Sequence, residues 1–182
     1  TTQGITLRSL APSGAGRALV TLDGVPQGDP FGGWVIWASL PTQLIEDVTI
    51  VRGGGAGAYG AGALTGVVDL SERATPGIAA EARAGSFDTA RGTLVGETDL
   101  AGNDVLVGLS GGRSDGYFPV RYGAGAADET LSESDWSGVL GVTRDLADGR
   151  RAGRVSYDDE DRGSGVAGAS GRARGGTASL TL

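Results

Sequence analysis

The chain has 182 residues, of which 35 are glycine and only 5% are aromatic, and its formal net charge is −7. Because it contains no cysteine and no histidine, zinc fingers, thiol nucleophiles, Ser-His-Asp triads and iron–sulfur sites are excluded. The acidic balance argues against a nucleic-acid partner. No stretch approaches the ~18 consecutive apolar residues of a transmembrane helix. We expect a protein that is not an enzyme and that needs no metal or cofactor.

The first region, residues 1–78, is predicted to be a small α+β domain. Gly/Pro turns separate four strand-like runs, at residues 5–10, 18–22, 48–51 and 67–70. Asp23-Gly24 directly follows the second run and is typical of a tight hairpin turn. Residues 40–46 are compatible with one helical turn that leads into the third strand.

Six glycines lie between Gly53 and Gly62, in the loop that joins the last two of these strands. Such a density indicates tight turns, positive φ or a close approach of the backbone to another surface. Residues 55–60 match G-x-G-x-x-G, so a loop that cradles a nucleotide phosphate is one interpretation. That site needs a helix directly after the loop, whereas two further glycines and the strand-like residues 67–70 follow. We expect a compact turn that binds no nucleotide.

The second region, residues 79–182, changes to a two-residue period, which is typical of strands with one apolar and one polar face. The alternation is found at residues 80–84, 90–100, 105–110, 135–143 and 177–182. We predict consecutive antiparallel strands. Their apolar face should carry Leu94, Leu140 and Leu180, and their polar face Glu97, Thr143 and Thr181.

The connections between these strands are predicted to alternate in length. Short ones lie at residues 101–104 and 146–149, and long polar ones at about 114–132 and 159–176. Short turns at one end and long loops at the other are typical of an outer-membrane barrel. The alternation does not tell whether the apolar face meets lipid or a protein core, so a soluble antiparallel sheet or a β-solenoid is the alternative.

Several separate motifs, in the same order, resemble the plug domain of TonB-dependent outer-membrane receptors. They are Leu19-Val-Thr-Leu-Asp-Gly-Val-Pro26, Ile45-Glu46 through Val51-Arg52-Gly53, Tyr59-Gly60 and Gly66-Val-Val-Asp-Leu70. Ser114-Asp115-Gly116-Tyr117 is similar to the first barrel hairpins of that family. Ser9, after Leu7-Arg8, departs from the glycine that the family usually has there.

The resemblance implies a mainly β protein, with a small α+β plug domain in residues 1–78 and antiparallel transmembrane β-barrel strands in residues 79–182. The family's barrel has about 22 strands. About six are expected here, and neither a TonB box nor the first plug strand is found, so plug and barrel are both expected to be incomplete. The chain is then a fragment of a longer receptor.

The function implied by the resemblance is energised uptake of a scarce ligand, such as an iron siderophore or cobalamin, across the outer membrane of a Gram-negative bacterium. The expected partners are outer-membrane lipid, a small-molecule ligand and the TonB energy-transducing complex, the last through a segment missing from this chain. The alternative is a non-transporting β-rich surface or binding protein. The sequence does not name the ligand.

Roles for single residues follow from the resemblance and from side-chain chemistry. The tentative plug apex facing the ligand consists of Arg8, Gln27, Gly28, Asp29, Trp34 and Trp37. The long loop offers Tyr117, Arg121 and Tyr122 for first capture of the ligand. Structural roles in the plug are expected for Glu46, Arg52, Gly53, Tyr59 and Gly60. Trp136 and Tyr157 are expected in an interfacial aromatic girdle.

Plainer roles remain open for some of these residues. Trp37 also suits an anchor that holds the plug in place. Glu46 and Arg52 also suit solvated charges at strand ends. Tyr117, Arg121 and Tyr122 are also compatible with loop side chains that contact only water.

Overall fold

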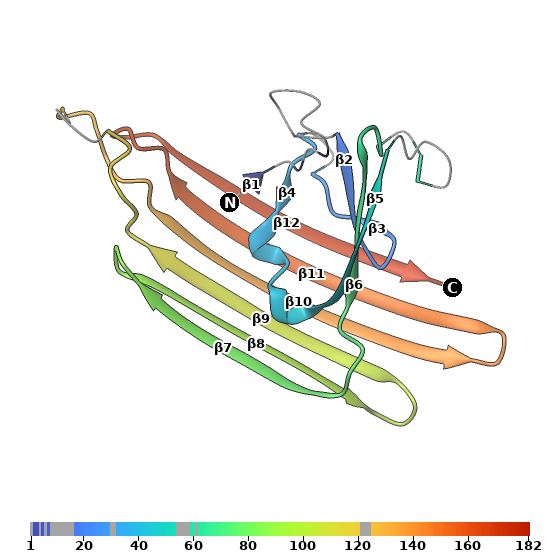
Figure 1. Ribbon diagram of the computed structural model, residues 1–182. Coiled ribbons are helices and arrows are strands. Elements are labelled where there is room, and N and C mark those ends of the chain that lie inside the picture. The colour runs from blue at the N-terminus through green and yellow to red at the C-terminus, as the bar shows by residue number, and fades with distance from the viewer. Residues whose placement is uncertain are drawn as a thin grey trace. The chain divides into compact units, whose positions relative to one another are not determined.

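The computed structural model describes residues 2–3, 5, 7, 17–29, 32–53, 59–60, 62–120 and 125–182. The chain divides into two compact units, Thr1–Ala74 and Thr75–Leu182 (Figure 1). Among the helices of the described residues, none has the length and apolar character needed to cross a membrane.

The first unit is built on a mixed four-stranded sheet in the order β3-β2-β6-β5. Its strands are β2 (Ala18–Leu22), β3 (Val25–Pro26), β5 (Ile45–Arg52) and β6 (Gly66–Glu72). β6 pairs in parallel with β2 and antiparallel with β5. A second, short pair joins β1 (Thr2–Gln3) to β4 (Val35–Ile36), and two 3-10 helices follow, η1 (Trp37–Ser39) and η2 (Thr42–Leu44).

The core of this unit is aliphatic. Val20 and Leu22 of β2 lie beside Val68 and Leu70 of β6, in register and on one face of the sheet. The remaining members of the cluster are Val35 and Leu40, with Ile5, Trp37 and Ile45 packed against it. Alternate residues of paired strands share a face, which is why two short runs suffice to build a continuous apolar surface.

Three of the four strands predicted in the first region are confirmed, because β2, β5 and β6 contain residues 18–22, 48–51 and 67–70. The helical turn predicted within residues 40–46 is η2. Asp23 and Gly24 have φ of +49° and +78°, the left-handed values of a tight hairpin turn between β2 and β3. For the predicted strand at 5–10, the structure describes only Ile5 and Leu7, and neither is in a strand.

The glycine-rich loop lies mostly outside the described residues, at 54–58 and 61. After Gly60, residues 62–65 form turns and bends, and β6 begins at Gly66. The expectation that no helix opens at this loop is therefore confirmed for the part of it that the structure describes.

The second unit is a six-stranded antiparallel sheet in which the strands lie side by side in chain order and the sheet curves (Figure 1). The strands are β7 (Gly77–Gly85), β8 (Thr89–Asp99), β9 (Asp104–Ser114), β10 (Glu133–Leu146), β11 (Gly149–Gly163) and β12 (Ser170–Thr181). This confirms the predicted run of consecutive antiparallel strands.

The register confirms the predicted division of side chains between two faces. Leu140 of β10 lies opposite Val107 and Val155, and the same face carries Leu94 and Leu180. The opposite face carries Glu97, Thr143 and Thr181, as predicted. We call these the apolar face and the polar face of the sheet.

One predicted connection is wrong. The long loop expected at residues 159–176 is a hairpin loop of residues 164–169, because β11 continues to Gly163 and β12 starts at Ser170. The charged residues that look like a loop in the sequence are paired across the strands: Asp159 accepts hydrogen bonds from Arg172 at 2.7 and 3.0 Å. The other long connection is confirmed, between Ser114 and Glu133.

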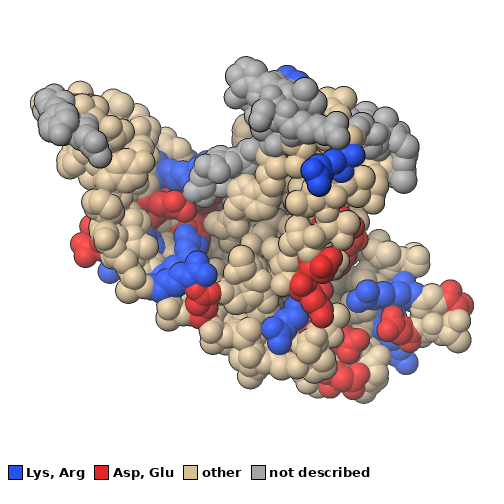
Figure 2. Space-filling model, viewed as in Figure 1, with Lys and Arg blue, Asp and Glu red and all other residues tan. Residues whose placement is uncertain are grey.

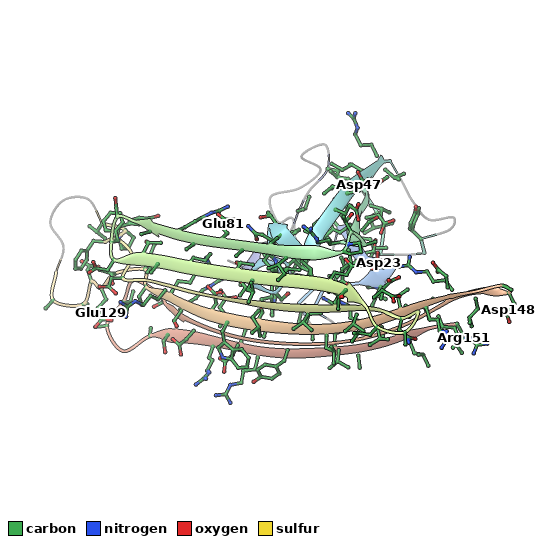
Figure 3. The ribbon with its side chains drawn as sticks, turned by 90° about the horizontal axis from the view of Figure 1, so that it is seen from below. Asp23, Asp47, Glu81, Glu129, Asp148 and Arg151 are labelled. Carbon is green, nitrogen blue, oxygen red and sulfur yellow. The ribbon has the colours of Figure 1, made fainter. Side chains whose placement is uncertain are left out.

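The hairpin loops therefore gather at two opposite ends of the sheet. One end holds the turn at residues 86–88, the long loop at 115–132 and the loop at 164–169. The other end holds the short turns at 100–103 and 147–148. In Figure 3, Glu129 marks the first of these ends, and Asp148 and Arg151 mark the second. We call them the loop end and the turn end.

Candidate functional site

Four of the residues predicted for the plug apex lie in a small hairpin built by backbone hydrogen bonds. Gly28 forms an isolated bridge with Val35, and the N–H of Asp29 donates to the carbonyl of Trp34 at 2.8 Å. The Asp29 carboxylate accepts a hydrogen bond from the N–H of Gly32 at 2.7 Å, which closes the turn. Gln27 is held by its side-chain amide, which donates to the carbonyl of Val25 at 2.9 Å. Gln27, Gly28, Asp29 and Trp34 are thus brought together.

The two tryptophans of this hairpin have different surroundings. The ring of Trp34 lies over Gly32, where an added Cβ would overlap it at 1.6 Å, and the residue is 39% exposed. Trp37 packs instead against the aliphatic core of the first unit. This packing favours the anchoring role for Trp37 and leaves Trp34 as the accessible aromatic. Arg8, the remaining apex residue, lies outside the described residues.

The residues expected to support the plug lie around the ends of β5. Glu46 accepts a hydrogen bond from the N–H of Ala74 at 2.8 Å, and Arg52 ends the strand with an exposed side chain. Gly53 and Gly60 have φ of +110° and +71°, values that side chains with a Cβ rarely adopt. Tyr59, directly before Gly60, is 40% exposed.

Gly66, after the glycine-rich loop, shows a close approach of backbone to backbone. An added Cβ there would lie 2.3 Å from the carbonyl oxygen of Val51, and its φ is +144°. The first residue of β6 therefore has to be glycine for β5 to pair at this point.

At the loop end of the sheet, Tyr117 is exposed and its ring lies 6.1 Å from that of Phe87, centroid to centroid. Phe87 belongs to the turn between β7 and β8, and both it and Asp88 have positive φ, +60° and +49°. Residue-by-residue inspection missed Phe87, although a bulky aromatic in a tight turn is an unusual signal. The other two predicted capture residues, Arg121 and Tyr122, lie outside the described residues.

The polar face carries a charged network that was not predicted in detail. Arg91 of β8 donates to both carboxylate oxygens of Asp135 on β10, at 2.8 and 2.5 Å, and lies 3.6 Å from Glu133. On β11, Arg162 pairs with Glu160. Acidic and basic side chains are accordingly interleaved on the surface seen in Figure 2. Asp135 and Glu160 are buried, and each has a guanidinium beside it as counter-charge.

The apolar face ends in aromatic and charged side chains toward the loop end. Trp136 and Tyr157 lie on this face with ring centroids 5.1 Å apart. Just beyond them, Asp159 pairs with Arg172 and Arg174. The apolar band thus stops where aromatic rings meet ion pairs, the order found at a membrane–water interface.

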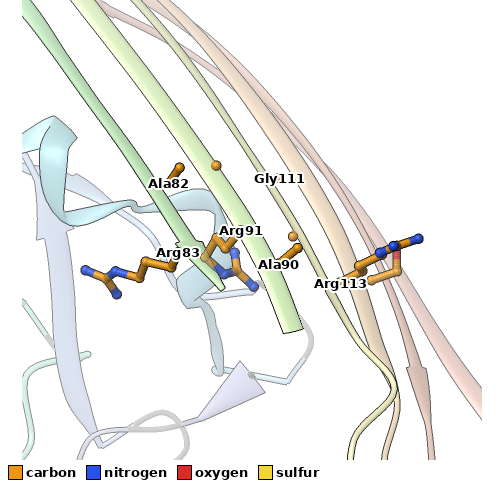
Figure 4. Close-up of a pocket in the computed structure, with 9 residues that line it drawn as sticks. Ala82, Arg83, Ala90, Arg91, Gly111 and Arg113 are labelled. Atoms are coloured by element: carbon orange, nitrogen blue, oxygen red, sulfur yellow. The ribbon is translucent and has the colours of Figure 1, made fainter. Parts of the chain in front are cut away.

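An open depression of about 530 Å³ crosses β7, β8 and β9 close to the loop end. It follows a row of small residues, Ala82, Gly92 and Gly111, that are paired with one another. Figure 4 shows Arg83 and Arg91 pointing to one side of the sheet and Arg113 to the other. The depression is present because glycine and alanine side chains in that row leave the space unfilled.

Comparison with known proteins finds similarity in both parts of the chain. Residues 1–67 match the TonB-dependent Receptor Plug Domain family. The vitamin B12 transporter BtuB of Photobacterium profundum is 26% identical over 145 residues, which cover 80% of this chain and 19% of that protein. Two solved receptors share the fold.

The first of these is the ferric-catecholate import receptor Fiu of E. coli K12, with a TM-score of 0.58 at 18% identity over 82% of this chain and 21% of Fiu. The second is the siderophore receptor PiuA of Acinetobacter baumannii, with a TM-score of 0.56 at 19% identity over 79% of this chain and 19% of PiuA. The chain therefore spans about a fifth of the length of the relatives it matches.

A TonB-dependent receptor plug domain in residues 1–67 is thus followed by strands that share the fold of receptor barrels. The family consists of transporters, not enzymes, and its members lie in the outer membrane of Gram-negative bacteria.

Proposed function

We propose that the receptor to which this chain belongs takes up a scarce small ligand, an iron siderophore or cobalamin, by energised displacement of its plug. The observation that carries the proposal is the order of the two units, a plug domain followed by strands with a polar and an apolar face. The relatives support the ligand classes, since they are named for vitamin B12, a ferric catecholate and siderophores. Energy would come from the TonB complex.

The proposed plug runs to about residue 78 and the proposed barrel strands from about residue 79. The division into units at Ala74 and the start of β7 at Gly77 support this boundary. Within the plug, a core of a few aliphatic side chains suits a domain that rearranges without unfolding the rest of the receptor.

We propose that the ligand contacts the apex hairpin through Gln27, Asp29 and Trp34. The hairpin is closed by its own hydrogen bonds, so its groups are held in place before a ligand arrives. Trp34 presents an exposed, rigid aromatic surface beside polar groups, a combination that suits small-molecule recognition. Tyr117 is proposed to make an earlier contact at the loop end.

The test uses cells that express the full-length receptor and a panel of radiolabelled ligands, namely ferric catecholate siderophores, ferric hydroxamate siderophores and cobalamin. One ligand class should bind at the surface and accumulate inside. Collapsing the proton gradient with an uncoupler should abolish accumulation and leave surface binding unchanged, because only plug displacement needs energy. Binding that never leads to accumulation would indicate the alternative, a non-transporting binding protein, and accumulation unaffected by the uncoupler would indicate a passive pore.

The apex assignment has its own variant. Trp34→Ala should weaken binding of the transported ligand about tenfold or more, the usual scale for losing a large aromatic contact. Thr49→Ala, at an exposed position of β5, serves as the matched control and should leave binding unchanged.

A further inference from the structure

Arg113 of β9 is a basic residue without a partner on the apolar face of the second unit. In the register of the sheet it lies between Ala90 of β8 and Ser134 of β10. Figure 4 shows its side chain on the opposite side of the sheet from Arg83 and Arg91. Within the described residues, its guanidinium forms no ion pair and no hydrogen bond. Because β8, β9 and β10 each have a strand on both sides, the lack of a partner does not arise at a sheet edge.

The other described arginines at the loop end of the apolar face already have acidic partners. Arg172 and Arg174 of β12 pair with Asp159 at 2.7 and 3.1 Å. Asp161 lies directly opposite Arg172 in the pairing of β11 with β12. A charged side chain on a lipid-facing surface is costly unless it has a partner. Arg113 is therefore a position where an anion from outside the chain would be stabilised.

An unfilled groove in the sheet begins next to Arg113. The depression of about 530 Å³ is lined by Arg113 together with Gly92 and Gly111. A Cβ added at Gly92 would meet no atom within 4 Å, so this space is open. A second depression, of about 400 Å³, shares the two glycines and extends to Leu94 and Leu109. We call the two depressions together the groove. It runs along β8 and β9 from Arg113 toward the middle of the sheet.

We propose that the groove binds a phosphate-bearing membrane lipid, with the phosphate on Arg113 and Ser134 and one acyl chain over Gly92 and Gly111. The planar fork of arginine matches the geometry of a phosphate, and the hydroxyl of Ser134 on the next strand adds a donor. Without a Cβ at the two glycines, the acyl chain can lie against the backbone. Trp136, which is 51% exposed and pairs in register with Gly111, offers an aromatic side wall.

The order of these groups along β9 matches the order of groups in a lipid. Arg113 lies two residues closer to the loop end than Gly111, a distance of about 6.8 Å along the strand. The head group therefore lies toward the loop end and the acyl chain toward the middle of the apolar face. The longer loops of outer-membrane barrels face the cell exterior, so the lipid comes from the outer leaflet. The proposal does not depend on which ligand the receptor transports.

The test uses the full-length receptor, freed of lipid in detergent, with a photo-reactive residue in place of Leu94 at the far end of the groove. The probe is radiolabelled bisphosphorylated lipid A, a phosphorylated glycolipid of the outer leaflet. The measurement is the lipid concentration that gives half-maximal crosslinking. Arg113→Gln should raise this concentration about tenfold or more, because charge-assisted hydrogen bonds to the phosphate are lost. An unchanged concentration would overturn the proposal.

Arg144→Gln is the matched control, because Arg144 is an exposed arginine of β10 near the turn end, and this variant should bind like the parent. Dephosphorylated lipid A tests the phosphate contact. It should bind the parent receptor about tenfold more weakly than lipid A does, whereas Arg113→Gln should bind the two lipids equally. Equal binding of both lipids by the parent would overturn the proposal. So would displacement of lipid A by an equal concentration of inorganic phosphate, since the site would then hold the free anion.

A second variant tests the acyl chain without changing a charge. Gly92→Leu fills the open space of the groove and should weaken lipid A binding about tenfold, the effect of losing roughly two buried CH₂ groups. Gly96→Leu, on the same face of β8 but outside the groove, should bind like the parent. Unchanged binding by Gly92→Leu would overturn the proposal. Arg113→Gln should also keep the unfolding midpoint of the parent in lipid-free detergent. A large loss there would show that Arg113 has a partner within the receptor, which would overturn the proposal as well.

Discussion

The two units of this chain bury opposite kinds of side chain. The cluster buried in the first unit is aliphatic, with Val20, Leu22, Val68 and Leu70 at its centre. In the second unit most of the buried side chains are polar or charged: Glu97, Ser110, Asp135, Ser137, Asp158 and Glu160. Its large apolar side chains, such as Leu94, Leu109 and Leu140, are about half exposed.

Both units are made of strands with a period of two, so strand geometry alone does not produce this difference. What differs is which face of the sheet the sequence makes apolar and what that face meets. In the first unit the apolar faces of β2 and β6 are covered by other parts of the same unit. In the second, the apolar face is left uncovered and is bounded by aromatic rings and ion pairs, which is the arrangement that lipid stabilises.

The largest effect is expected in the core of the first unit. Leu22→Ala removes a side chain that is 1% exposed, which typically costs about 2–5 kcal/mol. Hydrogen exchange in the full-length receptor should show faster exchange in β2 and β6, while β8 to β11 keep their protection. Thr49→Ala is the control. Equal loss of protection in both units would show that they unfold together and would break the comparison.

A slightly smaller effect is expected on the apolar face. Leu140→Arg should destabilise the full-length receptor in lipid by about 2–4 kcal/mol if the residue lies near the middle of the bilayer. Thr143→Arg, three residues along the same strand on the polar face, should cost much less. The free energy of unfolding in lipid vesicles is measured for both variants. Equal sensitivity at the two positions would mean that the apolar face meets protein rather than lipid.

On the polar face the effect of a single contact is smaller again. Asp135→Asn weakens two charge-assisted hydrogen bonds to Arg91, worth about 1.5–3 kcal/mol. A double-mutant cycle with Arg91→Gln should give a coupling of similar size. An absence of coupling would show that water replaces the ion pair at no cost, and the polar face would then resemble an ordinary exposed surface.

The smallest effect is expected where the apolar face ends. Tyr157→Leu keeps the side chain apolar but removes its ring contact with Trp136, worth about 0.5–1.5 kcal/mol. The fluorescence of the receptor's tryptophans and the unfolding midpoint in vesicles would follow the change. A loss as large as that of Leu140→Arg would place Tyr157 deep in the apolar band instead of at its boundary.

Several elements were predictable because the signal is local. Asp23-Gly24 marks a hairpin turn by its backbone preference alone, and both residues have the expected positive φ. Leu94, Leu140 and Leu180 were placed on one face by alternation, and the pairing confirms it. By contrast, residues 159–176 look like a loop in the sequence, because their charges find partners only when β11 and β12 pair.

The site residues divide in the same way. Trp34 and Trp37 are indistinguishable by type and spacing, yet one covers Gly32 at the surface and the other packs against the core. The pair of Arg91 and Asp135 was not predictable, since the two residues lie on β8 and β10 with a whole strand between them.

The sequence by itself determined the class of structure: a glycine-rich plug with short strands, followed by alternating strands that resemble a receptor barrel. Period-two alternation and turn residues act over a few positions, so they can be read without the fold. The tertiary structure decided the register, and with it which charges meet across which strands. The glycine at position 112, for example, allows Arg91 and Asp135 to form an ion pair across the strand between them. Such contacts depend on strands far apart in the chain, and a shift of one residue would undo them.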